Sequence, residues 1–504
     1  MPKHRMSKHR PGTPAQRPGR MGMAAATAVV VALSGGVVAT ATGTAAAVEA
    51  PDPAAADRAD RADFNNDGYA DTAVSAAGAH VAGQAEAGQV TALYGQPGGP
   101  RSVTFSQNSA GVPGAAEKDD LFGSDSAHGD FDGDGYDDLA VGTVREDVGS
   151  DVDGGSVTVL WGSASGLSTG TTVKDPRPTQ HDTFGGTLEA GDFDGDGRDD
   201  LVVGARSGAA TLDVFSGGIS RTGAVGRHYT VVPPVLNEAG TGPLNLHSGD
   251  VNADGREDLI VDGFDKSDTY NANFWLPGSA AGVTASGAQR LPGGHITDVG
   301  DTDSDGYGDI VIGMLWDEGI AGARKGGAVH VVRGAASGPD GGTDTFSQDT
   351  AGVPGGGEQN DVFGAELELG DVNGDGRLDL VVGAPGEDLD GVLDAGAVTV
   401  LYGAADGSGI TGEGARFLEQ NTPGVPNSGE TDDFFGSDVH LDDLNGDGRD
   451  DVVIGAYGEN GGNGAVHVLD SGADGSLTSP GGIYASDVGI STAGTPRLGS
   501  NFTD

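Results

Sequence analysis

The sequence contains no cysteine, few aromatic residues and little positive charge. Of its 504 residues, 93 are glycine and only 5% are aromatic, and 27 lysines and arginines stand against 76 acidic residues. Without cysteine, the chain has no disulfide, no thiolate metal ligand and no cysteine nucleophile. The formal net charge of −49 argues against nucleic acid and anionic lipid as partners, because both are negatively charged. Sulfur therefore does not stabilise this protein, and its partners are not polyanions.

Long apolar runs are also missing, except near the N-terminus. There, a basic leader precedes an apolar stretch, and a run of small residues ending at Ala47 follows it. This order is typical of a secretory signal peptide, and a retained membrane anchor is the alternative. We expect residues 1–47 to be the signal peptide, 48–60 a disordered linker and 61–504 the folded domain. The sequence thus predicts a secreted, extracellular protein with no membrane span after cleavage.

A nine-residue frame, D-x-[DN]-x-D-G-x-x-D, recurs seven times along the chain. The copies, here loops 1 to 7, begin at Asp63, Asp130, Asp192, Asp250, Asp301, Asp371 and Asp443. Their starts lie 51 to 72 residues apart, which is enough for four short strands with their loops. Short β-branched runs closed by glycine, such as Leu380–Gly383, follow the frames and indicate strands. The pattern predicts an all-β repeat protein.

Residues around the frame repeat as well. A Phe-Gly pair begins eight residues before four of the frames, at Phe122, Phe184, Phe363 and Phe435, and Gly383-Ala384-Pro385 follows loop 6. Together these features resemble FG-GAP repeats, the units of the propeller head of integrin α chains and of many bacterial secreted proteins. The resemblance covers about residues 60–504 and implies a seven-bladed β-propeller of four-stranded antiparallel blades. Blades 4 and 5 depart from it: Leu244-Asn245 and Gly294-His295 precede their frames, and neither blade has a Phe-Gly pair.

The two ends of the folded domain predict how the ring closes. Loop 1 has no Phe-Gly strand before it, whereas Leu498–Asp504 reads like Phe435–Leu441 with no frame after it. We therefore expect the C-terminal strand to complete the N-terminal blade.

The frame has the spacing of a calcium loop. Calcium takes six to eight oxygen ligands. The frame offers side-chain oxygens at positions 1, 3, 5 and 9, a backbone carbonyl at position 7 and a glycine at position 6, where the chain folds back. An EF-hand would need an acid at position 12, which is Val141 in loop 2 and Val203 in loop 3. Magnesium fits less well because it keeps more waters, and an ordinary Asp-Gly turn is the alternative for any single loop.

The sequence thus predicts up to seven Ca²⁺ ions, held by the residues of positions 1, 3, 5, 7 and 9. These are Asp63, Asn65, Asp67, Tyr69 and Asp71; Asp130, Asp132, Asp134, Tyr136 and Asp138; Asp192, Asp194, Asp196, Arg198 and Asp200; Asp250, Asn252, Asp254, Arg256 and Asp258; Asp301, Asp303, Asp305, Tyr307 and Asp309; Asp371, Asn373, Asp375, Arg377 and Asp379; and Asp443, Asn445, Asp447, Arg449 and Asp451.

Catalytic signatures are weak. Gly166–Gly170 fits the G-x-S-x-G motif around Ser168, but its flanks predict a turn without the helix that a nucleophile elbow needs. The acid pairs Glu146-Asp147 and Glu387-Asp388 are interpreted as solvated loop residues and not as a glycosidase pair. We expect no catalytic residues and no enzyme. The alternative is a secreted hydrolase of phosphodiester, ester or glycoside substrates on the same scaffold.

Binding is the favoured function. Three long loops with a common frame begin at Gln107, Gln348 and Gln420, and each joins the last strand of one blade to the first strand of the next. This connection places them on the face opposite the calcium loops, where they either bind a ligand or pack between blades. Five aromatic residues are candidates for carbohydrate stacking or, preferably, blade packing: Trp161, Trp275, Trp316, Tyr402 and Tyr457. The sequence predicts a monomeric, calcium-stiffened adhesion module for an extracellular protein or carbohydrate.

Overall fold

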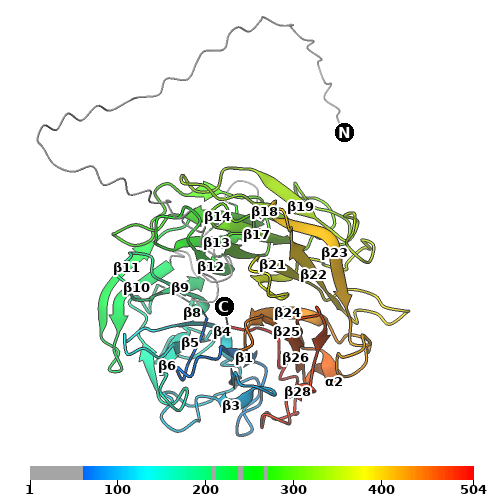
Figure 1. The fold of residues 1–504 in the computed structure, drawn as a ribbon. Coiled ribbons are helices and arrows are strands. Elements are labelled where there is room, and N and C mark those ends of the chain that lie inside the picture. Colours follow the sequence, from blue (N-terminus) through cyan, green and yellow to red (C-terminus); the bar gives the residue numbers. More distant parts are fainter. Residues whose placement is uncertain (1–60, 181, 207–211, 237–241, 266–270, 504) are drawn as a thin grey trace, which may run out of the picture. The chain divides into compact units, whose positions relative to one another are not determined.

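The computed structural model describes residues 61–180, 182–206, 212–236, 242–265 and 271–503, which form an all-β ring (Figure 1). Seven antiparallel sheets follow one another around a central axis in chain order. They are the blades of a seven-bladed β-propeller, which confirms the predicted fold class. The predicted signal peptide and linker lie outside the described residues.

The strands are short and group by blade. Blade 1 contains β1 (Asp71–Ala76), β2 (Gln89–Tyr94) and β3 (Arg101–Phe105); blade 2 β4 (Phe122–Gly129), β5 (Asp138–Thr143), β6 (Ser156–Leu160) and β7 (Gly170–Val173); blade 3 β8 (Asp182–Gly191), β9 (Asp200–Arg206), β10 (Leu212–Ile219) and β11 (Val225–Val231); and blade 4 β12 (Asn245–Gly249), β13 (Asp258–Phe264), β14 (Asn271–Leu276) and β15 (Gln289–Arg290).

Blade 5 contains β16 (Ile296–Gly300), β17 (Asp309–Met314), β18 (Ala328–Val332) and β19 (Thr343–Phe346); blade 6 β20 (Glu366–Gly370), β21 (Asp379–Ala384), β22 (Ala397–Gly403) and β23 (Ile410–Leu418); and blade 7 β24 (Phe435–Asp442), β25 (Asp451–Ala456) and β26 (Ala465–Ser471), with β27 (Leu477–Thr478) and β28 (Gly482–Tyr484) both paired to β26. The short helix α2 (Glu459–Gly462) precedes β26.

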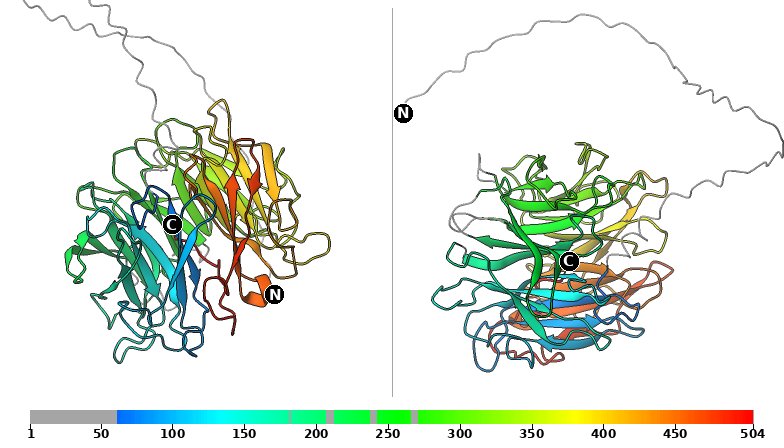
Figure 2. Two further views of the ribbon diagram at one scale, coloured as in Figure 1. Left: turned by 60° about the horizontal axis from the view of Figure 1, so that its bottom comes forward. Right: turned by 90° about the vertical axis from the view of Figure 1, so that its left-hand side faces the viewer.

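The core lies between the blades. Figure 2 shows the ring from two further directions, in which each blade is a twisted sheet of short strands. One apolar cluster joins Val311 and Val329 of blade 5 to Leu380 and Leu401 of blade 6. Neighbouring blades cover each sheet on both faces. All six residues of β21 are therefore buried, and the residues after Asp379 form an apolar run without the alternation of polar and apolar residues that a half-exposed strand shows.

Glycines allow the blades to approach closely. Gly436 follows the buried Phe435 and has φ +84°, in the left-handed region that favours glycine. A Cβ on Gly383 of the preceding blade would lie 2.2 Å from the carbonyl oxygen of Gly436. The Phe-Gly pair of one blade therefore contacts the Gly-Ala-Pro glycine of the previous blade. Replacing either glycine by a residue with a side chain would disrupt this contact.

C-terminal residues complete blade 1. Val74 in β1 forms an antiparallel bridge with Phe502, and the Ser75 N–H donates to the Asn501 carbonyl at 2.8 Å. Phe502 is buried against residues of blades 1 and 7. In Figure 1 the described part of the chain accordingly ends next to the axis, close to β1 and β4. This pairing confirms the predicted closure of the ring.

The first strands of the blades surround an axial cavity of about 730 Å³. In the described part of the chain, no helix reaches the length and hydropathy of a membrane span.

Candidate metal-binding loops

All seven loops have the same backbone cradle around the aspartate at position 1. One carboxylate oxygen of this residue accepts the N–H of position 5 at 2.9–3.1 Å. The other accepts the N–H of the glycine at position 6 at 2.8–2.9 Å. Each loop is therefore one closed turn, built in the same way around the ring.

Position 6 has the left-handed backbone that the frame predicts, with φ between +78° and +89°. Position 4 also has positive φ in every loop, which the frame did not predict. Five loops have glycine or asparagine there, residues that tolerate this conformation. Loops 4 and 5 instead have Ala253 at φ 55° and Ser304 at φ 60°. The backbone of these two loops is therefore strained at this position.

Position 9 is the first residue of β1 in blade 1 and of the second strand in the other six blades, and it is completely or almost completely buried. One of its carboxylate oxygens accepts a backbone N–H from the end of the third strand at 2.8–3.3 Å, as Asp138 does from Gly162. Burial raises the pKa of this aspartate to about 8 at Asp71, Asp138, Asp200, Asp379 and Asp451. Burial raises the pKa of Asp258 and Asp309 only to about 6, because additional hydrogen-bond donors stabilise their charged form.

Loops 2 and 3 contain oxygens that need a partner. The carboxylates of Asp130, Asp132 and Asp138 converge within 4.8 Å, as do those of Asp192, Asp194 and Asp196. Buried oxygens at positions 3 and 9 accept no hydrogen bond in either loop: Asp132 Oδ1, Asp138 Oδ2, Asp194 Oδ1 and Asp200 Oδ2. A buried carboxylate without a partner is costly, and a hard divalent cation is the partner that an all-oxygen set favours. The residues of these two loops fit calcium.

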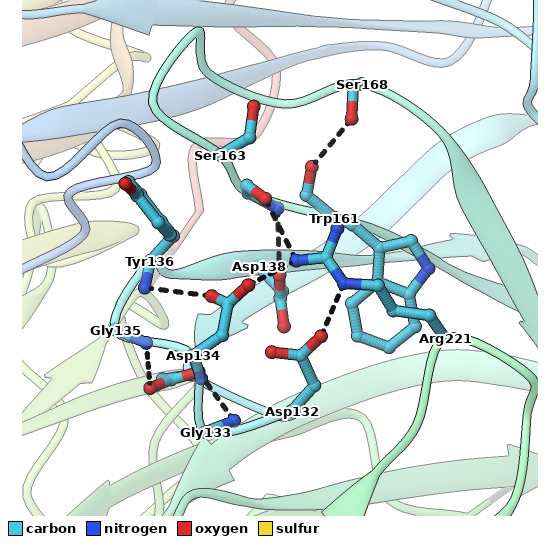
Figure 3. Close-up of polar contacts among 12 residues, drawn as sticks. Asp132, Gly133, Asp134, Gly135, Tyr136, Asp138, Trp161, Ser163, Ser168 and Arg221 are labelled. Atoms are coloured by element: carbon cyan, nitrogen blue, oxygen red, sulfur yellow. Dashed lines mark hydrogen bonds and ion pairs between the residues drawn. The ribbon is translucent and has the colours of Figure 1, made fainter.

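An arginine of blade 3 covers loop 2 (Figure 3). Arg221 follows β10, and its Nε and Nη2 donate to Asp132 Oδ2 at 2.5 Å and to Asp134 Oδ2 at 2.7 Å. Its guanidinium carbon lies 5.3 Å from the ring centroid of Trp161. The side chain is 40% exposed and leaves Asp132 Oδ1 and Asp138 Oδ2 without a partner. Arg221 therefore binds the outer oxygens of the loop and leaves the inner ones unpaired.

Loops 1, 4, 6 and 7 have asparagine at position 3. In each, the side-chain amide nitrogen of this asparagine lies 2.9–3.5 Å from the aspartate at position 9. Rotating the amide by 180° would turn its oxygen toward the same point, because the two amide atoms occupy equivalent positions. The asparagine loops can thus present the same four side-chain oxygens as loops 2 and 3.

Loops 4 and 5 have donors from the third strand of their own blade. The Trp275 indole N–H donates to Asp258 Oδ2 at 2.8 Å. In loop 5, Arg333 Nη1 donates to Asp303 Oδ2 at 2.8 Å and to Asp309 Oδ2 at 3.1 Å. Blades 4 and 5 also lack the Phe-Gly pair. Their predicted ligand residues are present, but protein donors contact the carboxylate at position 9.

The long loops on the opposite face contain a buried network that the sequence did not predict. The side-chain amides of Gln107, Gln348 and Gln420 donate to Glu146, Glu387 and Glu459 at 2.5, 2.6 and 2.7 Å. The interpretation of Glu146 and Glu387 as solvated was wrong, because Glu146 is half-buried and Glu387 is buried, whereas their neighbours Asp147 and Asp388 are exposed. The signal was the constant spacing of 39 residues between glutamine and glutamate.

Other candidate residues have structural roles. Ser168 lies in a turn between β6 and β7, where its hydroxyl donates to the Trp161 carbonyl at 3.3 Å, and no helix follows. Trp161 and Trp275 are buried, as expected for blade packing, whereas Trp316, Tyr402 and Tyr457 are half-buried.

The charged side chains of the axial cavity pair across blades. His247 Nε2 lies 2.8 Å from Asp298 Oδ1, and His440 Nδ1 lies 3.2 Å from Glu368 Oε1. Burial lowers the pKa of His440, but Glu368 and Asp442 outweigh it and raise the pKa well above its usual range. These contacts tie blade 4 to blade 5 and blade 6 to blade 7.

Comparison with known families and proteins agrees with the repeat pattern. The FG-GAP repeat model matches residues 184–225, 363–401 and 435–469, and the FG-GAP-like repeat model matches residues 130–203. These matches lie in blades 2, 3, 6 and 7.

Similar proteins are longer than this chain. The chain is 33% identical over 204 residues to phosphatidylinositol-glycan-specific phospholipase D of Mus musculus, covering 40% of this chain and 23% of the mouse protein. It is 28% identical over 408 residues to the Bos taurus protein of the same name, covering 78% and 42%. It is 30% identical over 241 residues to integrin alpha pat-2 of Caenorhabditis elegans, covering 41% and 19%. The chain thus spans less than half of the length of each.

Proposed function

Since the chain carries FG-GAP repeats on a seven-bladed propeller, we propose that it is a secreted, calcium-stiffened binding module. The observation that carries the calcium part is the set of buried, unpartnered carboxylate oxygens at positions 3 and 9 of loops 2 and 3. Divalent cations with oxygen ligands would neutralise these groups. The residues at positions 1, 3, 5 and 9 and the carbonyl at position 7 would hold each ion.

Calcium would have a structural role in this proposal. Position 1 follows the first strand of a blade, position 9 begins the second strand, and a carboxylate oxygen of position 9 accepts an N–H from the end of the third strand. An ion bound between positions 1 and 9 connects these elements. It also offsets the mutual repulsion of the carboxylates, so that ion binding and folding are coupled.

Calcium binding can be tested directly on the full chain. Isothermal titration after EDTA treatment should detect bound calcium, and Asp192→Asn should lose one site because it removes a carboxylate charge from loop 3. Asp147→Asn, an exposed residue outside the loops, is the matched control. An absence of calcium binding in the wild type would refute the proposal.

The ligand-binding face, in this proposal, is the one opposite the metal loops. There, the exposed tips of the long loops include Lys118, Glu358 and Glu430, while the buried Gln–Glu pairs fix the loop bases. Rigid loop bases with exposed polar tips suit recognition of an extracellular protein or carbohydrate.

Binding arrays test recognition. Glycan and matrix-protein arrays, probed with and without calcium, should give hits that depend on calcium and weaken when the tips of the long loops are replaced by Gly-Ser. Calcium-independent hits that survive tip replacement would contradict this binding face.

Fractionation of a culture tests export. Detection of the chain in the culture medium, with its N-terminus near residue 48, would support the predicted export.

We propose further that the propeller itself is not an enzyme. The relatives named as phospholipase D are more than twice as long as the region they share with this chain, so their activity need not reside in that region. A screen of phosphodiester, ester and glycoside substrates tests the hydrolase alternative. Turnover that persists through repurification would establish that alternative instead.

A further inference from the structure

Loop 5 has the ligand residues of a calcium loop but a different internal arrangement. Asp301, Asp303 and Asp305 converge within 4.8 Å, as the acids of loop 2 do. In loops 2 and 3, however, the buried oxygens at positions 3 and 9 have no partner, whereas Arg333 Nη1 lies 2.8 Å from Asp303 Oδ2 and 3.1 Å from Asp309 Oδ2. In loop 5, none of the described side-chain oxygens is both buried and unpartnered.

We infer that Arg333 replaces the calcium ion of loop 5, so that this loop is closed by a cation belonging to the chain. A calcium ion bound to the carboxylates of positions 3 and 9 would lie 2.3–2.6 Å from their oxygens, in the space between them. Arg333 Nη1 occupies that space and carries positive charge, so the ion and the guanidinium exclude each other. The inference goes beyond the proposed function, because it states that loop 5 binds no calcium ion.

The rest of the guanidinium is anchored outside the loop. Arg333 Nη2 donates to Asp344 Oδ2 on β19 at 2.9 Å and to the Ser408 carbonyl of blade 6 at 3.0 Å. The side chain is only 19% exposed, half the exposure of Arg221. Blade 6 has Gly409 beside it, where a Cβ would come within 2.5 Å of Nη2. Arg333 is therefore held from both sides and also ties blade 5 to blade 6.

Position 2 of loop 5 contributes to the same arrangement. The Thr302 hydroxyl donates to Asp309 Oδ2, the oxygen whose counterpart in loop 2 has no partner. The other six loops have Phe, Val or Leu at this position. With Gly334 N–H on Oδ1 at 2.9 Å, both oxygens of Asp309 are satisfied by protein donors.

Calcium counting on the full chain tests the inference. Native mass spectrometry of the calcium-loaded wild type should show fewer ions than loops. Asp192→Asn in loop 3 should lose one ion, whereas Asp301→Asn in loop 5 should lose none. Loss of one ion in D301N would overturn the inference, because it would show that loop 5 binds calcium despite Arg333.

A calcium-free measurement keeps the inference separate from the proposed function. In EDTA, Arg333→Met should lower the melting temperature by several degrees, because it removes the guanidinium that pairs with Asp303 and Asp309. Arg377→Met is the matched control: Arg377 bonds Asp375 in its own loop and is 31% exposed, so its loss should change the melt little. An R333M melt in EDTA equal to that of the wild type would overturn the inference. Failure of the wild type to bind any calcium would overturn only the proposed function.

Discussion

Loops 2 and 5 have aspartate at positions 1, 3, 5 and 9 and tyrosine at position 7, yet their interiors differ. Loop 2 keeps buried oxygens of Asp132 and Asp138 unpartnered, whereas in loop 5 Thr302 and Arg333 donate to Asp309. The ligand residues are the same, and the difference comes from their neighbours. Whether an acidic loop needs an ion therefore depends on the hydrogen-bond donors around it, which the frame does not specify.

Removing calcium should change the stability of the protein more than any other test of the difference between loops 2 and 5. At a free concentration of 100 times Kd, each bound ion contributes about 2.7 kcal/mol to the free energy of unfolding. With several loops occupied, EDTA should lower the melting temperature by on the order of 10 °C, and added calcium should restore it.

Hydrogen exchange would locate the effect. Amides of loop 2 should lose protection in EDTA, while those of loop 5 should keep it, because Arg333 remains in place. Equal loss in both loops would remove the distinction between them, and an unchanged melt would refute calcium binding.

Acidifying the calcium-free protein should stabilise it. Burial raises the pKa of Asp138 and Asp200 to about 8, far above the pKa of an aspartate in the unfolded chain. Between these pKa values the folded state binds more protons, so the free energy of unfolding rises as pH falls from 8 to 6. Differential scanning calorimetry in EDTA should show this rise.

Calcium reverses the sign of this effect. Protons compete with the ion for the same carboxylates, so the calcium-loaded protein should gain no stability on the same acidification. If the melting temperature of the calcium-free protein were lower at pH 6 than at pH 8, the carboxylates of Asp138 and Asp200 could not be buried without partners.

Substitutions at position 9 should separate the two kinds of loop. In calcium, Asp138→Asn should lose about 3 kcal/mol of stability with the ion, and in EDTA it should cost little because Asp138 Oδ2 has no partner to lose. Asp309→Asn should lose about 1–3 kcal/mol in both conditions, because Arg333 loses a charged partner.

Denaturant unfolding of both variants, with and without calcium, measures this difference. The asparagine keeps an acceptor oxygen for the N–H of Gly162 or Gly334, so the comparison isolates the charge. If the loss in D309N depended on calcium as strongly as the loss in D138N, loops 2 and 5 would be equivalent.

The smallest effect concerns the backbone of position 4. Ser304→Gly should relieve a left-handed conformation and stabilise the protein by up to about 1 kcal/mol. Gly133→Ala, at the same position of loop 2, should destabilise by a similar amount. Thermal melts in calcium check both signs, and a loss of stability in S304G would mean that Ser304 has a favourable contact that outweighs its strain.

Much of the fold could be predicted because it repeats. Seven frames and the Phe-Gly pairs specify the blades, and the match between Leu498–Asp504 and Phe435–Leu441 predicted the closure. The Gln–Glu pairs and the positive φ at position 4 were missed, although both follow constant spacings.

The role of Arg333 could not be inferred from the frame, because it lies 24 residues after Asp309 and reaches the loop only through strand pairing. A signal did exist. Arg333 precedes the glycine that donates to position 9, and Tyr94, Trp161 and Tyr402 stand at that place in other blades. Ser216, Pro277 and Asp470 stand there in the remaining three blades, so Arg333 is the one basic residue at this place, but its target is visible only in three dimensions.

The strand that closes the ring also sets the order in which the molecule can be finished. Val74 and Ser75 pair with Phe502 and Asn501, so this edge of the first blade stays unpaired during synthesis until those two residues have been made and have left the ribosome. An exposed strand edge is a template for misassociation. A product truncated before Asn501 would therefore keep this strand edge exposed.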